Sequence, residues 1–69
     1  MKITVYGVVQ GVGFRPTVYR VATAMGLKGF VLNNGSNVEI HIDRDAERFL
    51  EELTKALPAL ARIDRAEFE

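Results

Sequence analysis

The stretch KGFVLN-NG-SN-VEIHID, residues 28–43, decides the fold that we predict for this 69-residue chain. Lys28–Asn33 and Val38–Asp43 both have the composition of strands, and the second one alternates apolar with polar residues. Between them, Asn34-Gly35 is the strongest short signal for a hairpin turn, because both residues tolerate a positive φ. We therefore predict an antiparallel β-hairpin at the centre of the chain.

A helical pattern lies on each side of this hairpin. The first helix is predicted to begin at Pro16, since proline suits the first helical position, and to stop at Gly26. The second is predicted to follow a cap at Asp43 or Asp45 and to end at Pro58. Apolar residues recur at helical spacing in both segments, so each helix should bury one stripe. These residues are Val18, Val21, Ala22 and Met25 in the first helix, and Ala46, Phe49, Leu50, Leu53 and Leu57 in the second.

Strands are also predicted at both ends of the chain. Lys2–Val9 is rich in β-branched and aromatic residues. The pattern of Arg62–Glu69 is weaker because its alternation slips between Ile63 and Ala66, and we expect a bulge or a late start there. The resulting order is β-α-β-β-α-β. It predicts an α+β, ferredoxin-like sandwich in which four antiparallel strands carry both helices on one face, as a single domain over residues 1–69.

The composition argues against several classes of function. Nine basic and nine acidic side chains give zero net charge, whereas nucleic-acid binders normally carry excess Lys and Arg. The chain has no cysteine and one histidine, His41, which the strand pattern places on a polar surface. No apolar run approaches the roughly 18 residues of a membrane span, and the N-terminus lacks a signal-peptide pattern. We expect a cytoplasmic protein with no metal or other cofactor, and with neither nucleic acid nor membrane as a partner.

The segment from Gly7 to Arg15 is the candidate for chemistry. Its glycines at positions 7, 11 and 13 permit backbone conformations that are closed to other residues. At a junction between a strand and a helix, such a loop can turn successive N–H groups toward an anion, beside the positive end of the helix dipole. The P-loop motif does not fit, because it needs Lys and then Ser or Thr after its last glycine, and here Gly13 is followed by Phe14-Arg15. The dinucleotide-binding fingerprint does not fit either, because it needs glycine where Pro16 stands.

Arg15 is the most telling residue of this segment. With Pro16 at the first helical position, Arg15 is predicted at the N-cap, where Ser, Thr, Asp or Asn is favoured and a cation costs about 0.3–1 kcal/mol against the helix dipole. A bound phosphate would reverse that cost, because the guanidinium can hold two of its oxygens. The loop pattern alone leaves open that the glycines only form a tight turn and that Arg15 is solvated. Spacing alone likewise makes Asn33 a turn residue.

Two motifs resemble one known family. Gly7–Arg15, GVVQGVGFR, is similar to the signature of the acylphosphatases, and Gly29–Asn33, GFVLN, is similar to their second element, Gly-aromatic-Val-x-Asn. The resemblance covers nearly the whole chain. Pro16 and the run Leu60–Asp64, LARID, further resemble the N-terminal domain of HypF-type hydrogenase maturation carbamoyltransferases.

This resemblance implies an enzyme that hydrolyses the carboxyl–phosphate bond of a small acyl phosphate, carbamoyl phosphate being the favoured substrate. It implies that Arg15 binds the phosphoryl group and that Asn33 orients the attacking water. It further implies that later domains of a larger maturation protein are partners, and that a short strand found after the fourth strand in typical members is missing here. By the same resemblance, the phosphate of the substrate or inorganic phosphate would be held by Gln10, Gly11, Val12, Gly13, Phe14 and Arg15.

Two other classes of function share parts of this pattern. A phosphate-binding or acyl-phosphate-binding module would keep the loop and Arg15 but show little turnover outside a full-length protein. An RNA-binding module shares the β-α-β-β-α-β order, but such modules stack bases on aromatic residues of their central strands. The strand Val38–Ile42 carries no Phe, Tyr or Trp, and the zero net charge also disfavours RNA.

Overall fold

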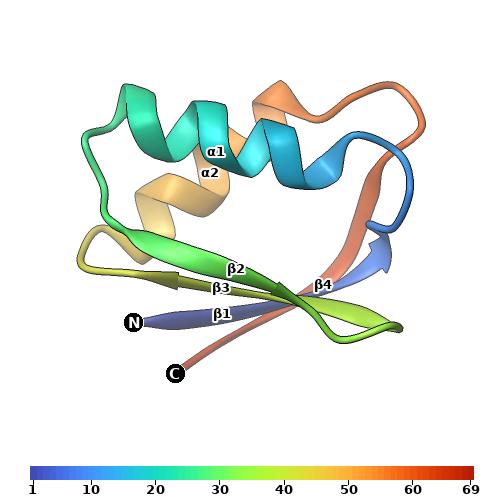
Figure 1. Cartoon of the computed structure of the whole chain (residues 1–69), viewed down its shortest axis with the longest axis horizontal. Coiled ribbons are helices and arrows are strands. Elements are labelled where there is room, and N and C mark those ends of the chain that lie inside the picture. The colour runs from blue at the N-terminus through green and yellow to red at the C-terminus, as the bar shows by residue number, and fades with distance from the viewer.

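The computed structural model describes all residues, 1–69, and confirms the predicted order of elements (Figure 1). The elements are β1 (Lys2–Val8), α1 (Phe14–Ala24), β2 (Gly29–Asn33), β3 (Asn37–Ile42), α2 (Ala46–Ala56) and β4 (Arg62–Phe68). Every strand lies within one residue of its predicted bounds. Neither helix has the length and hydrophobicity that a membrane-spanning segment requires.

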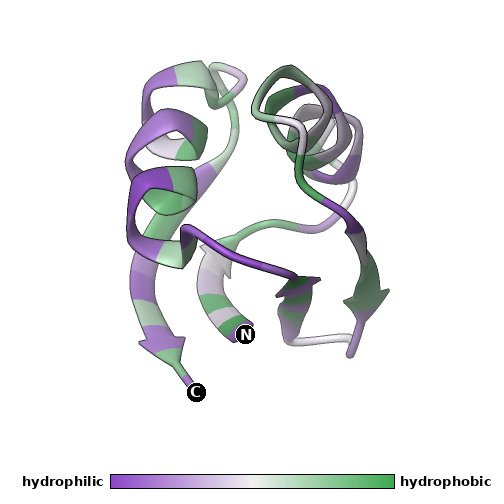
Figure 2. Ribbon diagram, turned by 90° about the vertical axis from the view of Figure 1, so that its left-hand side faces the viewer, coloured by the Kyte–Doolittle hydropathy of each residue, from purple (hydrophilic) through white to green (hydrophobic).

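The four strands form one antiparallel sheet in the order β2-β3-β1-β4. Both helices lie side by side over one face of this sheet, which confirms the ferredoxin-like architecture (Figure 2). The core fills the layer between sheet and helices, and both the strands and the predicted helix stripes contribute to it. Its fully buried members are Ile3, Val5, Val9, Phe14, Val18, Val38, Ile40, Phe49 and Leu53.

The irregularity predicted in the last strand is a β-bulge. Tyr6 of β1 pairs with Arg65 of β4, but the next residue, Gly7, pairs with Ile63, so Asp64 has no partner. The two backbones approach so closely that a Cβ on Gly7 would lie 2.2 Å from the carbonyl oxygen of Arg62. β1 ends one residue later, at Val8, and the loop toward α1 leaves the sheet next to this close contact.

The start of α1 corrects one prediction. The helix begins at Phe14 rather than Pro16, and its N-cap is Gly13, which has left-handed backbone angles (φ 79°, ψ 15°). Phe14 is 1 % exposed, and its burial draws the first turn into the core. Pro16 then stands at the third helical position, where it costs no hydrogen bond because the first N–H groups of a helix have no partner within it.

The cap of α2 is the second correction. Asp45 occupies the N-cap position, but neither predicted side chain caps the helix: Asp45 is left-handed (φ 56°) and makes no side-chain cap bond. The Asp43 carboxylate instead accepts a hydrogen bond from the Lys28 N–H at 3.0 Å, and this bond is the main reason why the pKa of Asp43 lies below its ordinary value. Asp43 thus links the start of β2 to the end of β3.

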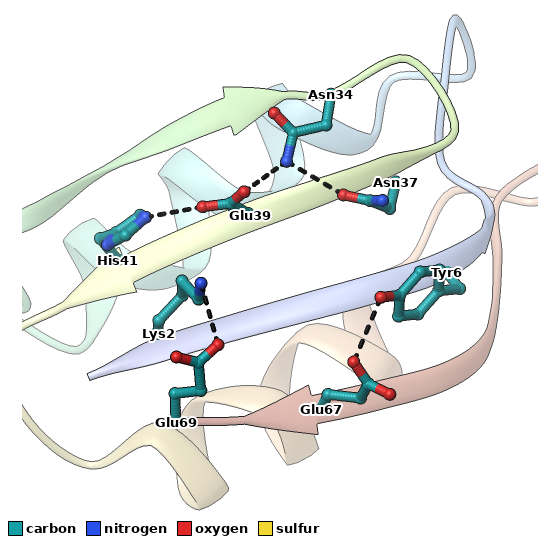
Figure 3. A network of polar contacts seen from close by, with 8 residues as sticks. All are labelled: Lys2, Tyr6, Asn34, Asn37, Glu39, His41, Glu67 and Glu69. Atoms are coloured by element: carbon teal, nitrogen blue, oxygen red, sulfur yellow. Dashed lines mark hydrogen bonds and ion pairs between the residues drawn. The ribbon is translucent and has the colours of Figure 1, made fainter.

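A row of polar contacts crosses the face of the sheet that the helices leave open (Figure 3). Glu39 accepts a hydrogen bond from the side-chain amide of Asn34 and contacts His41 Nε2 at 3.2 Å. His41 also stacks on Phe30, with ring centroids 4.3 Å apart. The hydrogen bond from Asn34, followed by that from His41, holds the pKa of Glu39 below its ordinary value. His41 therefore lies on the polar surface, as predicted, although neighbouring side chains half-cover it.

We expect the stability of the Glu39→Gln variant to depend less on pH in the acid range than the stability of the parent does. A carboxylate whose pKa is lowered by folding stabilises the protein above its unfolded-state pKa of about 4.3, and this contribution disappears as pH falls through the lower folded-state value. Urea unfolding between about pH 6 and pH 2 should therefore lose less stability in Glu39→Gln than in the parent. Glu51→Gln, on the exposed side of α2, is the control and should follow the parent. Parallel curves for all three proteins would contradict this expectation.

Candidate active site

Arg15 lies at the second position of α1, exposed to solvent at the positive end of the helix. No carboxylate or carbonyl of the protein accepts a hydrogen bond from its guanidinium. Arg44 and Arg62, by contrast, each pair with an aspartate at 2.7 Å. No acidic residue stands in the first turn of α1 to offset the charge. Arg15 is thus a free cation placed where the helix dipole itself favours an anion.

The backbone of the preceding loop offers a run of unused donors. None of the six consecutive N–H groups from Gln10 to Arg15 donates a hydrogen bond to another group of the protein. The left-handed conformations of Gly11 and Gly13 (φ 66° and 79°) bend the chain between them. Consecutive free N–H groups in such a bend, next to a helix N-terminus, are the usual backbone arrangement for holding an anion.

Buried and hydrogen-bonded side chains anchor this loop to the body of the protein. Val9 and Phe14, at its two ends, are 2 % and 1 % exposed. The Thr17 hydroxyl donates to the carbonyl of Gly13 at 2.9 Å, and the Gln10 side-chain amide donates to the carbonyl of Asn37 at 3.3 Å. The second of these bonds ties the loop directly to the first residue of β3, so the loop is held against the hairpin that carries Asn33.

Asn33 is the last residue of β2, and its side chain is partly engaged. Its Oδ1 accepts a hydrogen bond from the N–H of Gly35 at 2.8 Å, which stabilises the hairpin turn. Asn33 therefore has the turn role that its spacing predicts. The Nδ2 donor of the same side chain has no partner in the protein. Asn33 follows Val31 by two residues, so both side chains leave β2 on the face that the helices cover.

The structure brings the two predicted catalytic residues to the same end of the molecule. The loop between β1 and α1 and the hairpin between β2 and β3 lie at the end opposite the chain termini (Figure 1). Arg15 and Val31 line a common shallow depression together with Pro16 and Tyr19. The start of α1 therefore lies beside β2, two residues before Asn33. Arg15, the loop and Asn33 form one surface region assembled from three separate elements.

One further signal for this region is visible in the sequence as an uneven distribution of charge rather than as a motif. All nine acidic residues lie from Glu39 onward, so residues 1–38 contain Lys2, Arg15, Arg20 and Lys28 and no carboxylate side chain. The zero net charge of the whole chain conceals this asymmetry. The half of the chain that builds the loop, α1 and β2 is cationic, which favours binding of an anion there.

This fold and this site define an acylphosphatase domain. The family model of the acylphosphatases matches residues 1–69, and the chain belongs to that family. A carbamoyltransferase HypF from Rhizobium leguminosarum is 54% identical over 65 residues, and an acylphosphatase from Thermotoga maritima is 48% identical over 63 residues, or 86% of this chain and 70% of that protein. The crystal structure of HypF from T. kodakarensis superposes with a TM-score of 0.87 at 49% identity over the full chain.

The relatives fall into two groups of very different length. The chain spans 9% of the Rhizobium HypF and 10% of the T. kodakarensis structure. It spans 77% of an acylphosphatase from Bacillus subtilis whose crystal structure superposes with a TM-score of 0.83 at 28% identity. The same domain thus occurs both as a small protein and as one part of a much larger one, and this chain is similar to both forms.

Proposed function

We propose that this chain hydrolyses the carboxyl–phosphate bond of small acyl phosphates, with carbamoyl phosphate as its substrate in a HypF-type maturation protein. The observation that carries the proposal is the run of six free N–H groups, Gln10 to Arg15, next to the unpaired guanidinium of Arg15. Family membership and similarity to proteins named carbamoyltransferase HypF support the substrate class. Later domains of the longer protein would receive or use the product of this site.

Arg15 and the loop would hold the phosphoryl group. Phosphoryl transfer passes through a loose transition state whose charge spreads over three equatorial oxygens. Donors fixed in advance around those oxygens stabilise the charge without reorganising, which is the largest contribution in many active sites. The guanidinium would take two oxygens through its planar fork, and the N–H groups of Gln10 to Phe14 would take the remaining lone pairs.

Asn33 would orient the attacking water. Because its Oδ1 is engaged by Gly35, the side chain is left with Nδ2 as a donor, and Nδ2 can hold the oxygen of a water molecule in line with the phosphorus. The carboxylate of an acyl phosphate is a good leaving group, so positioning and charge stabilisation supply most of the acceleration. The water proton passes to a phosphate oxygen, and no side chain of the site needs to act as a general base.

We expect Asn33→Ala to lower kcat for carbamoyl phosphate by about a hundredfold, because a misplaced water costs that much, while KM changes little. Steady-state phosphate release measures both constants. Loss of the Gly35 contact should cost about 1 kcal/mol of stability, so assays belong well below the melting temperature. Asn34→Ala, in the same turn, is the matched control and should keep the parental kcat. Equal rates for parent and Asn33→Ala would remove Asn33 from the mechanism.

A binding module without turnover is the second candidate, favoured by the small share of the HypF proteins that this chain represents. Inorganic phosphate should then shift the backbone amide NMR signals of residues 10–15, while neither carbamoyl phosphate nor acetyl phosphate is hydrolysed. Hydrolysis of either substrate by the parent chain would exclude this second candidate.

A further inference from the structure

A second surface depression continues from the Arg15 site along the seam between α1 and β2. Its volume is about 280 Å³, and eight of its twelve lining residues are hydrophobic. Figures 1 and 2 both show α1 lying above the edge strand β2, where this seam runs. Tyr19 and Val31 line both this apolar pocket and the depression around Arg15, so the two lie next to each other. A ligand held at Arg15 has an apolar path leading away from it.

The local sequence explains why the pocket is open. Gly29 of β2 has no side chain to cover the seam, and even a Cβ there would lie 1.7 Å from the carbonyl oxygen of His41. On the helix side, the small residues Ala22 and Thr23 face the same space. The floor consists of Val18, Ile40 and Ile42, which belong to the core of the protein.

The edge of the pocket includes one large exposed aromatic side chain. Tyr19, on the helix side, is 65% exposed, whereas the side chains of Phe30 and Leu32 lie on the opposite, open face of the sheet. An exposed aromatic residue beside an apolar depression marks a surface that contacts an apolar ligand or partner. The free guanidinium of Arg15 at one end of the seam indicates that this ligand carries an anionic head.

We propose that the site also accepts acyl phosphates with a medium-length apolar acyl chain, and that this chain lies in the α1–β2 pocket. This inference rests on the proposed hydrolytic function of Arg15 and the loop. From Arg15 to Thr23, eight residues further along, α1 rises about 12 Å, a length that an acyl chain of roughly eight to ten carbons covers. The reaction is the same as for a small substrate. The water oxygen bonds to phosphorus, the bond from phosphorus to the bridging oxygen breaks, and the fatty carboxylate leaves with the electron pair while the phosphate keeps the protons of the water.

The test compares octanoyl phosphate with acetyl phosphate, which share the reacting group and differ in the chain. The parent should have a KM for octanoyl phosphate about tenfold or more below that for acetyl phosphate, since each buried methylene adds to binding. Ala22→Leu fills the pocket and should abolish this preference. Ala24→Leu, the same change two residues further along α1 and outside the pocket, should retain it. Thr23→Phe provides a second filling variant at an exposed position in case Ala22→Leu unfolds.

Three results would overturn the proposal. The first is equal KM values for the two substrates in the parent, and the second is an unchanged preference in both filling variants. The third is a dimer in light scattering whose β2 amides are protected from exchange, which would assign the apolar pocket to a second copy.

If neither substrate is hydrolysed, the proposed function fails instead. The pocket is then tested by titrating octylphosphonate against methylphosphonate. Shifts of the Ala22, Thr23 and Gly29 amide signals with octylphosphonate alone would support it, and their absence would refute it.

Discussion

Replacing Arg15 by alanine is expected to lower kcat/KM for carbamoyl phosphate by about a thousandfold, the scale seen when one preorganised charge-stabilising donor is removed from an active site. The loss should fall on both constants, because in the proposed mechanism the guanidinium binds the phosphate of the substrate and also the charge that spreads over its oxygens in the transition state. Arg15 is exposed and makes no contact that folding needs. Its removal from the first turn of α1 should therefore leave stability unchanged or slightly raised.

Two further variants show whether the effect belongs to this position. Arg15→Lys keeps the charge but loses the planar fork, so its rate should lie between those of the parent and the alanine variant. Arg20 is also an exposed cation of the same helix and forms no ion pair, so Arg20→Ala should keep the parental rate within a factor of about three. A parental rate in Arg15→Ala would contradict the proposed mechanism. A comparable loss in Arg20→Ala would mean that general cationic charge, rather than the site, drives turnover.

The elements that sequence patterns predict best are those whose pattern matches what the fold buries. The alternation of Val38, Ile40 and Ile42 predicts the inner face of β3, and all three are at most 5 % exposed. The slip between Ile63 and Ala66 predicts the bulge, because one extra residue in β4 restores the inward direction of its apolar side chains. In both places the local signal and the tertiary structure agree, so little beyond periodicity is needed.

The starts of the helices were harder to predict because tertiary contacts decide them. Proline is common at the first helical position, but burial of Phe14 draws the start of α1 two residues earlier. The N-cap at Gly13 then leaves Arg15 inside the first turn, where its charge opposes the dipole as expected although the position is different. Asp45 stands at the predicted cap position, yet Phe49 N–H bonds its carbonyl and its carboxylate is left out.

The candidate site was partly visible in the sequence. The glycines and Arg15 indicate an anion-binding loop. Glycine spacing cannot show which N–H groups of this loop stay free, because that depends on all the hydrogen bonds that the folded loop makes. Asn33 reads as a turn residue, and the structure gives it that role through Oδ1. No sequence motif predicts the seam between α1 and β2. The seam is open because Ala22 has a small side chain and Gly29 has none.

Gly7→Ala is expected to lower stability by about 3 kcal/mol or more, since overpacking against rigid backbone cannot relax cheaply. The added Cβ would lie 2.2 Å from the carbonyl oxygen of Arg62 and 2.9 Å from the N atom of Asp64. Both atoms are backbone, so relief requires β1 and β4 to separate at the bulge. For a chain of this size such a loss lowers the melting temperature by roughly 15 °C.

Gly35→Ala separates this steric effect from the cost of a left-handed backbone. Gly35 also has a positive φ (85°), but a Cβ there meets no atom within 4 Å. Its replacement should cost only about 1 kcal/mol, the ordinary cost of placing alanine at such an angle. Thermal or urea unfolding of both variants measures the difference. If the two losses are equal, the close approach of β1 and β4 contributes nothing, and the bulge cannot be what directs the loop between β1 and α1 away from the sheet. A loss several times larger for Gly7→Ala, accompanied by weaker phosphate binding at the loop, would tie the position of the site to the packing of the last strand against the first.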